Sequence, residues 1–126
     1  LMKILVADDD DELRGLVEIV LTSAGYTVSA HANGRLAWES LQAKGADMAV
    51  LDINMPEMDG LELLDNIRAD QRFKKMPVVL LTARRTSTDQ EHGYERGADD
   101  YMTKPFENDA LVARLKLLEQ AFPQNG

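Results

Sequence analysis

Near its start the chain reads Lys3-Ile4-Leu5-Val6-Ala7-Asp8-Asp9, an apolar run that ends abruptly in carboxylates. The run Met48-Ala49-Val50-Leu51-Asp52 repeats this arrangement. Short runs of Ile, Leu, Val and Ala without polar alternation are typical of parallel strands that are covered on both faces. The two runs therefore favour an α/β domain and argue against a β-sandwich.

Outward from these runs, short apolar segments alternate with longer amphipathic ones along the whole chain. This alternation is typical of parallel strands that are joined in turn by helices. The predicted strands are residues 3–7, 27–31, 48–51, 78–81 and, with a weaker pattern, 100–102. We therefore predict a (βα)5 doubly wound fold with a parallel five-stranded sheet.

Helices are predicted from apolar residues that recur along one face. These residues are Leu13, Leu16, Val17 and Val20, then Leu36, Ala37, Trp38 and Leu41, then Leu61, Leu64 and Ile67, and finally Leu111, Leu115 and Leu118. Gly25 is predicted to end the first helix, Asn33 to cap a second helix over residues 34–44, and Asp59-Gly60 to precede the third. Residues 86–96 contain few apolar side chains and an interior glycine, so we predict a marginal helix in a mobile region.

The bulk composition excludes several classes of function. A net charge of −8 would repel a phosphate backbone, so we expect no direct binding of nucleic acid. The chain has no cysteine for disulfides or thiolate metal sites, and no basic leader or apolar segment long enough for a membrane. We expect a soluble cytoplasmic domain over residues 1–122, with residues 123–126 as a domain end or the start of a linker.

Carboxylates gather where two of the predicted strands end. Asp8 and Asp9 follow the first strand and Asp52 ends the third. Ligands of open α/β sheets bind at the carboxyl ends of the strands. If the first and third strands are neighbours, these carboxylates repel one another unless a hard divalent cation binds between them. We therefore predict a magnesium site.

Two further side chains are expected at the same edge. Thr82 ends the fourth strand and offers a hydroxyl, and Lys104 follows the fifth strand with a cation on a flexible stem. Taken singly, a threonine such as Thr82 is most often only a strand-end hydroxyl, and a lysine such as Lys104 is most often only a surface charge. Together with magnesium and carboxylates they form a phosphoryl-transfer site, in which Asp52 is the predicted covalent acceptor.

Other polar residues are interpreted without a catalytic role. Asp10 and Asp11 suit the N-terminal turn of the first helix. A calcium-binding EF-hand loop is rejected because Leu13 stands where such a loop needs glycine. His31 and His92 have no partners for a metal site or a hydrolase triad, and both are left out of the site.

Four stretches closely resemble the receiver domains of bacterial response regulators, the phosphoacceptors of two-component signalling. They are Ile-Leu-Val-Ala-Asp-Asp-Asp at 4–10, Leu-Asp-Ile-Asn-Met-Pro-Glu-Met-Asp-Gly at 51–60, Val-Leu-Leu-Thr-Ala at 79–83 and Gly-Ala-Asp-Asp-Tyr-Met-Thr-Lys-Pro-Phe at 97–106. The resemblance covers nearly the whole chain, with the motifs in the family's order at the strand ends. It implies the flavodoxin-like strand order 2-1-3-4-5.

The resemblance also implies the roles of the site residues. Asp52 would accept a phosphoryl group from a sensor histidine kinase or a histidine phosphotransfer protein. Asp8, Asp9 and Asp52 would hold magnesium together with the backbone carbonyl of Asn54, and Lys104 would contact the phosphoryl oxygens. The domain would catalyse its own phosphorylation and dephosphorylation without being a conventional enzyme. A cis peptide bond is expected between Lys104 and the proline that follows it.

A switch is implied as well. Thr82 would move towards the phosphoryl group while Tyr101 turns inward, which changes the surface of the fourth helix, fifth strand and fifth helix. A tyrosine beside a strand is also commonly a packing residue. A downstream effector, or a second copy of the chain in a phosphorylation-dependent homodimer, would bind the surface of the fourth helix, fifth strand and fifth helix. Asp100 and Arg114 match part of the family's dimer pattern, whereas Gln90 and Ala110 replace an expected charged pair.

Two other classes of function were weighed against this one. Magnesium-dependent phosphohydrolases of the haloacid dehalogenase type need a second acid two residues after the nucleophile, where this chain has Asn54. A receiver-like module that binds partners without phosphorylation would not need the acidic triplet, Thr82 and Lys104 intact. Both alternatives are therefore disfavoured.

Overall fold

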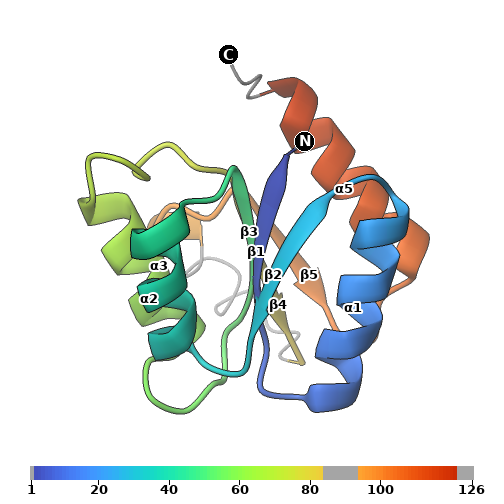
Figure 1. Ribbon diagram of the computed structural model, residues 1–126, viewed down its shortest axis with the longest axis horizontal. Helices are drawn as coiled ribbons and strands as arrows, with labels where there is room; N and C mark the ends of the chain where they lie inside the picture. The colour runs from blue at the N-terminus through green and yellow to red at the C-terminus, as the bar shows by residue number, and fades with distance from the viewer. Residues whose placement is uncertain (1, 84–93, 122–126) are drawn as a thin grey trace.

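The computed structural model describes residues 2–83 and 94–121. Within these ranges, five parallel strands form one sheet in the order β2-β1-β3-β4-β5, and helices lie on both faces of it (Figure 1). The elements are β1 (Lys3–Ala7), α1 (Asp11–Ser23), β2 (Thr27–His31), α2 (Gly34–Lys44), β3 (Met48–Asp52), α3 (Gly60–Ala69), β4 (Val78–Thr82), β5 (Asp100–Thr103) and α5 (Asn108–Ala121). The predicted doubly wound, flavodoxin-like architecture is confirmed.

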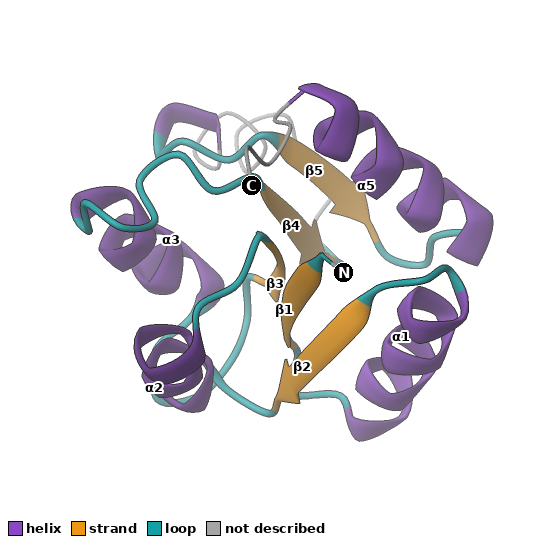
Figure 2. Ribbon diagram, turned by 45° about the horizontal axis from the view of Figure 1, so that its top comes forward, coloured by secondary structure: helices purple, strands orange, loops and turns teal. Residues whose placement is uncertain are grey.

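The helices separate into two layers, with α1 and α5 on one face of the sheet and α2 and α3 on the other (Figure 2). Successive residues of β1 alternate between these layers: Ile4 and Val6 pack in the cluster with α1 and α5, whereas Leu5 and Ala7 pack in the cluster with α2 and α3. Since both faces are covered, every second residue finds an apolar environment on each side. This is the reason that the strands read as continuous apolar runs.

The observed boundaries agree closely with the pattern in the sequence. The strands β3, β4 and β5 each extend one residue beyond the prediction, to Asp52, Thr82 and Thr103. The helix α2 spans the predicted residues and Asn33 caps it, since the Asn33 side chain accepts a hydrogen bond from the amide of Leu36. Of the marginal helix predicted over residues 86–96, the structure describes only residues 94–96, so that prediction and its mobility fall outside the described residues.

Two residues predicted on core-facing helix faces are exposed. Leu16 of α1 retains 45% of its accessible surface and Leu36 of α2 retains 38%. The apolar stripe on each helix is wider than the surface that the sheet covers, so the residue at its margin remains in contact with solvent. For Leu16 this exposure places an apolar side chain next to the carboxyl edge of the sheet.

Within residues 2–83 and 94–121, no helix is long and apolar enough to cross a membrane.

Candidate functional site

The acidic residues predicted to meet at the carboxyl edge do so. In the parallel register, Ala7 of β1 lies beside Leu51 of β3, so the residues that follow each of them are neighbours. One carboxylate oxygen from each of Asp8, Asp9 and Asp52 lies within 4.8 Å of the others. Asp8 and Asp52 are 1% and 4% exposed, whereas Asp9 is open to solvent. The cluster therefore has a buried base and an accessible mouth.

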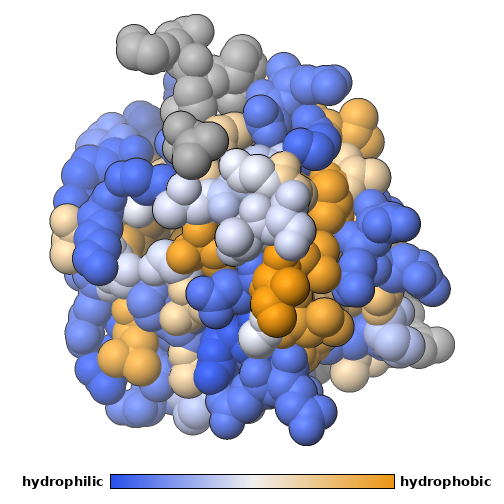
Figure 3. All heavy atoms as spheres, turned by 45° about the vertical axis from the view of Figure 1, so that its right-hand side comes forward, coloured by the Kyte–Doolittle hydropathy of each residue, from blue (hydrophilic) through white to orange (hydrophobic). Residues whose placement is uncertain are grey.

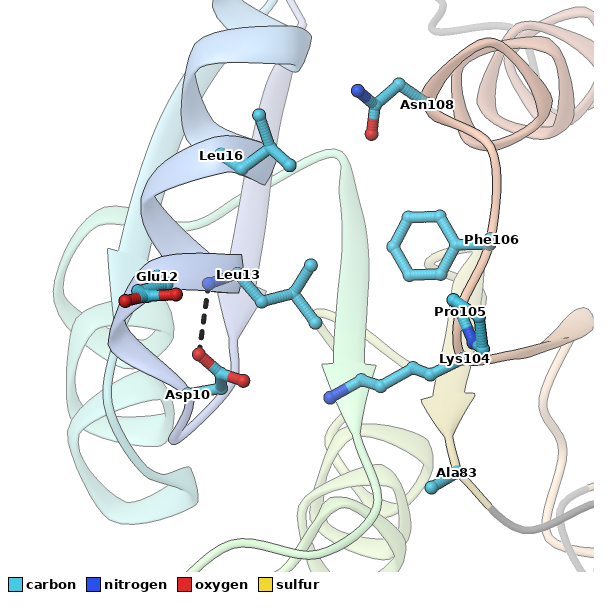
Figure 4. Close-up of a pocket in the computed structure, with 9 residues that line it drawn as sticks. All are labelled: Asp10, Glu12, Leu13, Leu16, Ala83, Lys104, Pro105, Phe106 and Asn108. Carbon is cyan, nitrogen blue, oxygen red and sulfur yellow. Dashed lines mark hydrogen bonds between the residues drawn. The ribbon is translucent and has the colours of Figure 1, made fainter.

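Lys104 reaches into this cluster from the loop after β5. Its Nζ donates a hydrogen bond of 2.9 Å to Oδ2 of Asp8 and lies 3.5 Å from Oδ2 of Asp52. Figure 4 shows the extended lysine side chain pointing away from Pro105 and Phe106 towards the N-terminal end of α1. The peptide bond between Lys104 and Pro105 is cis, as the sequence predicted.

The electrostatics of the cluster are dominated by burial and by like charges. Burial and the neighbouring carboxylate of Asp8 raise the pKa of Asp52 to about 6, against the opposing effect of Lys104. For Lys104, burial lowers the pKa, but hydrogen bonding to Asp8 and the charge of Asp52 outweigh it, so the pKa lies above its ordinary value. One ammonium group faces three carboxylates, and the remaining negative charge suits a divalent cation.

The start of α1 holds Asp8 in place. The amide of Asp10 donates to Oδ1 of Asp8 at 3.0 Å, and the side chain of Asp10 caps α1 by accepting from the amide of Leu13 (Figure 4). Arg14 donates to the backbone carbonyl of Asp8 at 2.9 Å and pairs with Asp11 at 2.6 Å. The helix-start role predicted for the two outer aspartates is confirmed. Arg14 was missed in the sequence, although its spacing from Asp11 is that of a helical ion pair.

The remaining predicted site residues lie around this cluster. Thr82 ends β4, is fully buried and pairs in register with Thr103 of β5. Tyr101 is 6% exposed, and its ring centroid lies 6.4 Å from that of Tyr94. Asn54 lies exposed in the loop that follows Asp52. The structure therefore places Asp8, Asp9, Asp52 and Lys104 in direct reach of one another, with Thr82 on the adjacent strand.

The other residues considered in the sequence have separate surroundings. His31 hydrogen bonds to Oγ of Ser29 at 2.7 Å, in line with its omission from the site. Asp100 and Arg114 form an ion pair within the chain. His92 and Gln90 lie outside the described residues.

A cavity of about 600 Å³ opens beside Lys104, between α1 and the loop that leads into α5. Its apolar wall is formed by Leu13, Leu16, Pro105 and Phe106, which surround an open space in Figure 4. The same face continues along α1 to Ile19, which is 66% exposed. Figure 3 shows the hydrophobic side chains that gather on this face, over α1 and α5. These side chains form an apolar strip, made of Leu13, Leu16, Ile19, Pro105 and Phe106, which ends beside Lys104 and the acidic cluster.

Several known proteins have a sequence similar to that of this chain. The family model described as the response regulator receiver domain matches residues 4–116. The transcriptional regulatory protein GltR of Pseudomonas aeruginosa is 42% identical over 115 residues, which cover 91% of this chain and 48% of the relative. The transcriptional regulatory protein TctD of Salmonella typhimurium is 44% identical over 117 residues, 93% of this chain and 51% of the relative. The chain thus spans about half the length of these relatives.

Solved structures agree with the sequence relatives. The chemotaxis protein CheY4 of Vibrio cholerae has a TM-score of 0.88 and 32% identity, over 93% of this chain and 98% of that one. A signal receiver domain of a signal transduction histidine kinase from Syntrophus aciditrophicus has a TM-score of 0.91 and 29% identity, over 100% and 96% of the two chains. With a family match over most of its length, and with the acidic cluster and lysine at the carboxyl edge of the sheet, the chain belongs to the response regulator receiver domains of two-component signal transduction.

Proposed function

We propose that this receiver is a phosphoacceptor in which Asp52 takes the phosphoryl group from a phosphohistidine on a sensor kinase or a phosphotransfer protein. The observation that carries the proposal is the position of Asp52, whose buried carboxylate lies within 4.8 Å of those of Asp8 and Asp9 and 3.5 Å from the ammonium group of Lys104. Carboxylates are established covalent acceptors in phosphoryl transfer, and such a reaction depends mainly on positioning and charge stabilisation.

The donor set fits a magnesium ion. Carboxylate oxygens are the ligands that this hard cation prefers, and the cluster carries more negative charge than Lys104 can neutralise. The residues that would hold the ion are Asp8, Asp9 and Asp52, with the backbone carbonyl of Asn54. When bound, magnesium supplies positive charge next to the oxygens of the group being transferred.

In the proposed transfer, an oxygen of ionised Asp52 attacks phosphorus while the bond from phosphorus to the donor imidazole nitrogen breaks and its electron pair stays on the imidazole. Since burial raises the pKa of Asp52, positive charge nearby favours the ionised, nucleophilic form of its carboxyl group. Lys104 is placed to supply part of that charge and to contact the oxygens of the group joined to Asp52. The same residues would position a water molecule for self-catalysed dephosphorylation.

The proposed output is a two-state change that passes along β4 and β5. Thr82 would move towards the phosphoryl oxygens, and Tyr101, which is already buried beside Tyr94, would be held in that inward position. One contact supports this path: the amide of Lys104 donates to the carbonyl of Thr82 at 2.7 Å, which joins the end of β4 to the residue after β5. A downstream effector or a second copy of the chain would read the surface that includes β5 and α5.

The apolar strip supports a protein as phosphoryl donor. Leu16 and Ile19 expose hydrophobic surface on the face that borders the cavity beside Lys104. Such a patch is typical of a protein-binding surface.

We further propose that the receiver domain spans residues 1–122 and that residues 123–126 are a domain end or the start of a linker. We also propose that the reaction takes place in the cytoplasm, where kinases find ATP.

The test is incubation with acetyl phosphate and magnesium, followed by measurement of the intact mass. The wild type should gain one phosphoryl group, and Asp52→Asn or an excess of EDTA should prevent this gain. An adduct on Asp52→Asn, or none on the wild type, would contradict the proposal. Continuous release of phosphate from many small esters would instead favour a phosphohydrolase.

A further inference from the structure

The loop between β3 and α3, residues 53–59, contains two residues in an unfavourable backbone conformation. Glu57 has a φ of 52° and Met58 a φ of 107°. L-residues other than glycine rarely adopt positive φ, and for a bulky side chain the conformation is strained. Strain of this kind persists only where the surrounding structure enforces it. The contacts that hold the loop therefore determine the path of the backbone directly after Asp52.

The first of these contacts comes from α2. The amide of Gly34, the first residue of α2, donates to the carbonyl oxygen of Met58 at 3.2 Å. A Cβ atom at position 34 would collide with this same carbonyl group. Only glycine allows the backbone of the loop to approach α2 so closely.

The residues on either side of Gly34 bind the side chain of Glu57. Asn33, which is 7% exposed, caps α2 with its side-chain oxygen and donates from its side-chain nitrogen to Glu57 at 3.4 Å. Nε of Arg35 lies 3.2 Å from the other oxygen of Glu57. The exposed ion pair between Arg35 and Glu57 contributes little to stability on its own. Together, however, Asn33, Gly34 and Arg35 bind both strained residues of the loop.

The C-terminal end of the loop is fixed independently. The amide of Gly60 donates to the carbonyl of Ile53 at 2.8 Å, and a Cβ at Gly60 would collide with the carbonyl of Asp52. Nδ2 of Asn66 lies 3.4 Å from the sulfur of Met58. The loop is therefore bound by α3 at one end and by α2 at its strained section, which limits the positions open to Asn54.

We propose that the N-terminal turn of α2, made of Asn33, Gly34 and Arg35, positions the 53–59 loop and thereby sets the affinity of the acidic cluster for magnesium. This inference rests on the proposed function, because it takes the carbonyl of Asn54 as one of the ligands. The three residues are positioning residues: they touch the loop, not the ion. Release of the loop moves the carbonyl while Asp8, Asp9 and Asp52 stay in place.

The experiment is calorimetric titration of magnesium into the unphosphorylated chain, with Gly34→Ala compared with Gly15→Ala. Gly15 lies in the middle of α1, and a Cβ added there meets no atom within 4 Å, so it is a matched control. We expect Gly34→Ala to weaken magnesium binding roughly tenfold, as loss of an orienting contact in a metal site commonly does. Gly15→Ala should bind as the wild type does. Amide chemical shifts of residues 54, 55 and 57–59 without magnesium should move only in Gly34→Ala.

A second variant serves if Gly34→Ala does not fold. Asn33→Ser keeps a good helix cap but removes the amide donor to Glu57. It should weaken magnesium binding by a smaller factor while the helix content is unchanged. Wild-type affinity in Gly34→Ala despite shifted loop amides, or in Asn33→Ser if only that variant folds, would overturn the inference. Failure of the wild type to bind magnesium at all would instead refute the proposed function.

Discussion

The ionised carboxylate of Asp52 should destabilise the fold when magnesium is absent. Its pKa rises from an ordinary value of 3.8 to about 6 because of burial and the charge of Asp8. One pKa unit corresponds to about 1.4 kcal/mol, so the ionised group lowers the free energy of unfolding by about 3 kcal/mol. Replacement by asparagine removes this charge, and Asp52→Asn should be more stable than the wild type by up to about 3 kcal/mol near pH 7.5.

The sign of the pH dependence follows from the direction of the shift. Between about pH 4 and pH 6 the folded state binds more protons than the unfolded state, so the free energy of unfolding falls as the pH rises through this window. Near pH 5 Asp52 is largely protonated in the folded wild type, and the advantage of Asp52→Asn should shrink to about half. If the folded cluster binds magnesium as proposed, the ion should stabilise the wild type more than the variant, which lacks one of the three carboxylates.

Urea unfolding followed by the fluorescence of Trp38, the only tryptophan of the chain, measures these differences. The series comprises the wild type and Asp52→Asn in EDTA near pH 7.5 and pH 5, repeated with saturating magnesium near pH 7.5. Equal stabilities in EDTA near pH 7.5 would refute the argument from burial and like charge. A difference of the same size at both pH values would show that the gain has a cause other than the charge of Asp52.

Further predictions concern the cation, the switch and the stability of the fold. Lys104→Met should slow phosphorylation by acetyl phosphate roughly a hundredfold, as loss of a charge-stabilising donor typically does, and an unchanged rate in a mass time course would argue against its role. Thr82→Ala should still form the adduct, but the fluorine signal of fluorotyrosine at Tyr101 should no longer shift on phosphorylation; a shift like that of the wild type would separate Tyr101 from Thr82. Arg68→Ala should lower the free energy of unfolding by about 3 kcal/mol, since Arg68 donates to the carbonyls of Gly97 and Met76 and pairs with Asp99 at 2.9 Å. The exposed Arg72→Ala, its control, should change the same quantity by less than about 0.5 kcal/mol, and equal effects in urea would contradict the structural role of Arg68.

The sequence contained most of the local information about the site. The polar residue at the end of each of three apolar runs marked Asp8, Asp52 and Thr82, and the structure places all three at one edge of the sheet. The helix cap at Asn33 could also be predicted, because capping depends on residues close together in the chain. These predictions succeeded because strand periodicity and helix capping are set by short-range geometry.

Contacts between distant segments could not be predicted from the sequence in the same way. Nothing near Gly34 in the chain indicates that a carbonyl from residue 58 approaches it, and nothing near Arg68 indicates its partner at residue 99. The exposure of Leu16 was also missed, since helical periodicity gives the direction of a side chain but not the extent of the surface that covers it. Each of these features depends on how elements pack across the sheet.

The sequence by itself determined the class of fold, the edge at which the site lies and the residue types gathered there. The tertiary structure decided the distances, the burial and therefore the charge state. Asp52 has a raised pKa because the fold buries it beside Asp8, and Lys104 opposes this effect because its side chain reaches Asp8 and Asp52 from the loop after β5. The physical reason is that a side chain's type is local, whereas its electrostatic environment is the sum of groups brought together by the parallel register and the crossover connections.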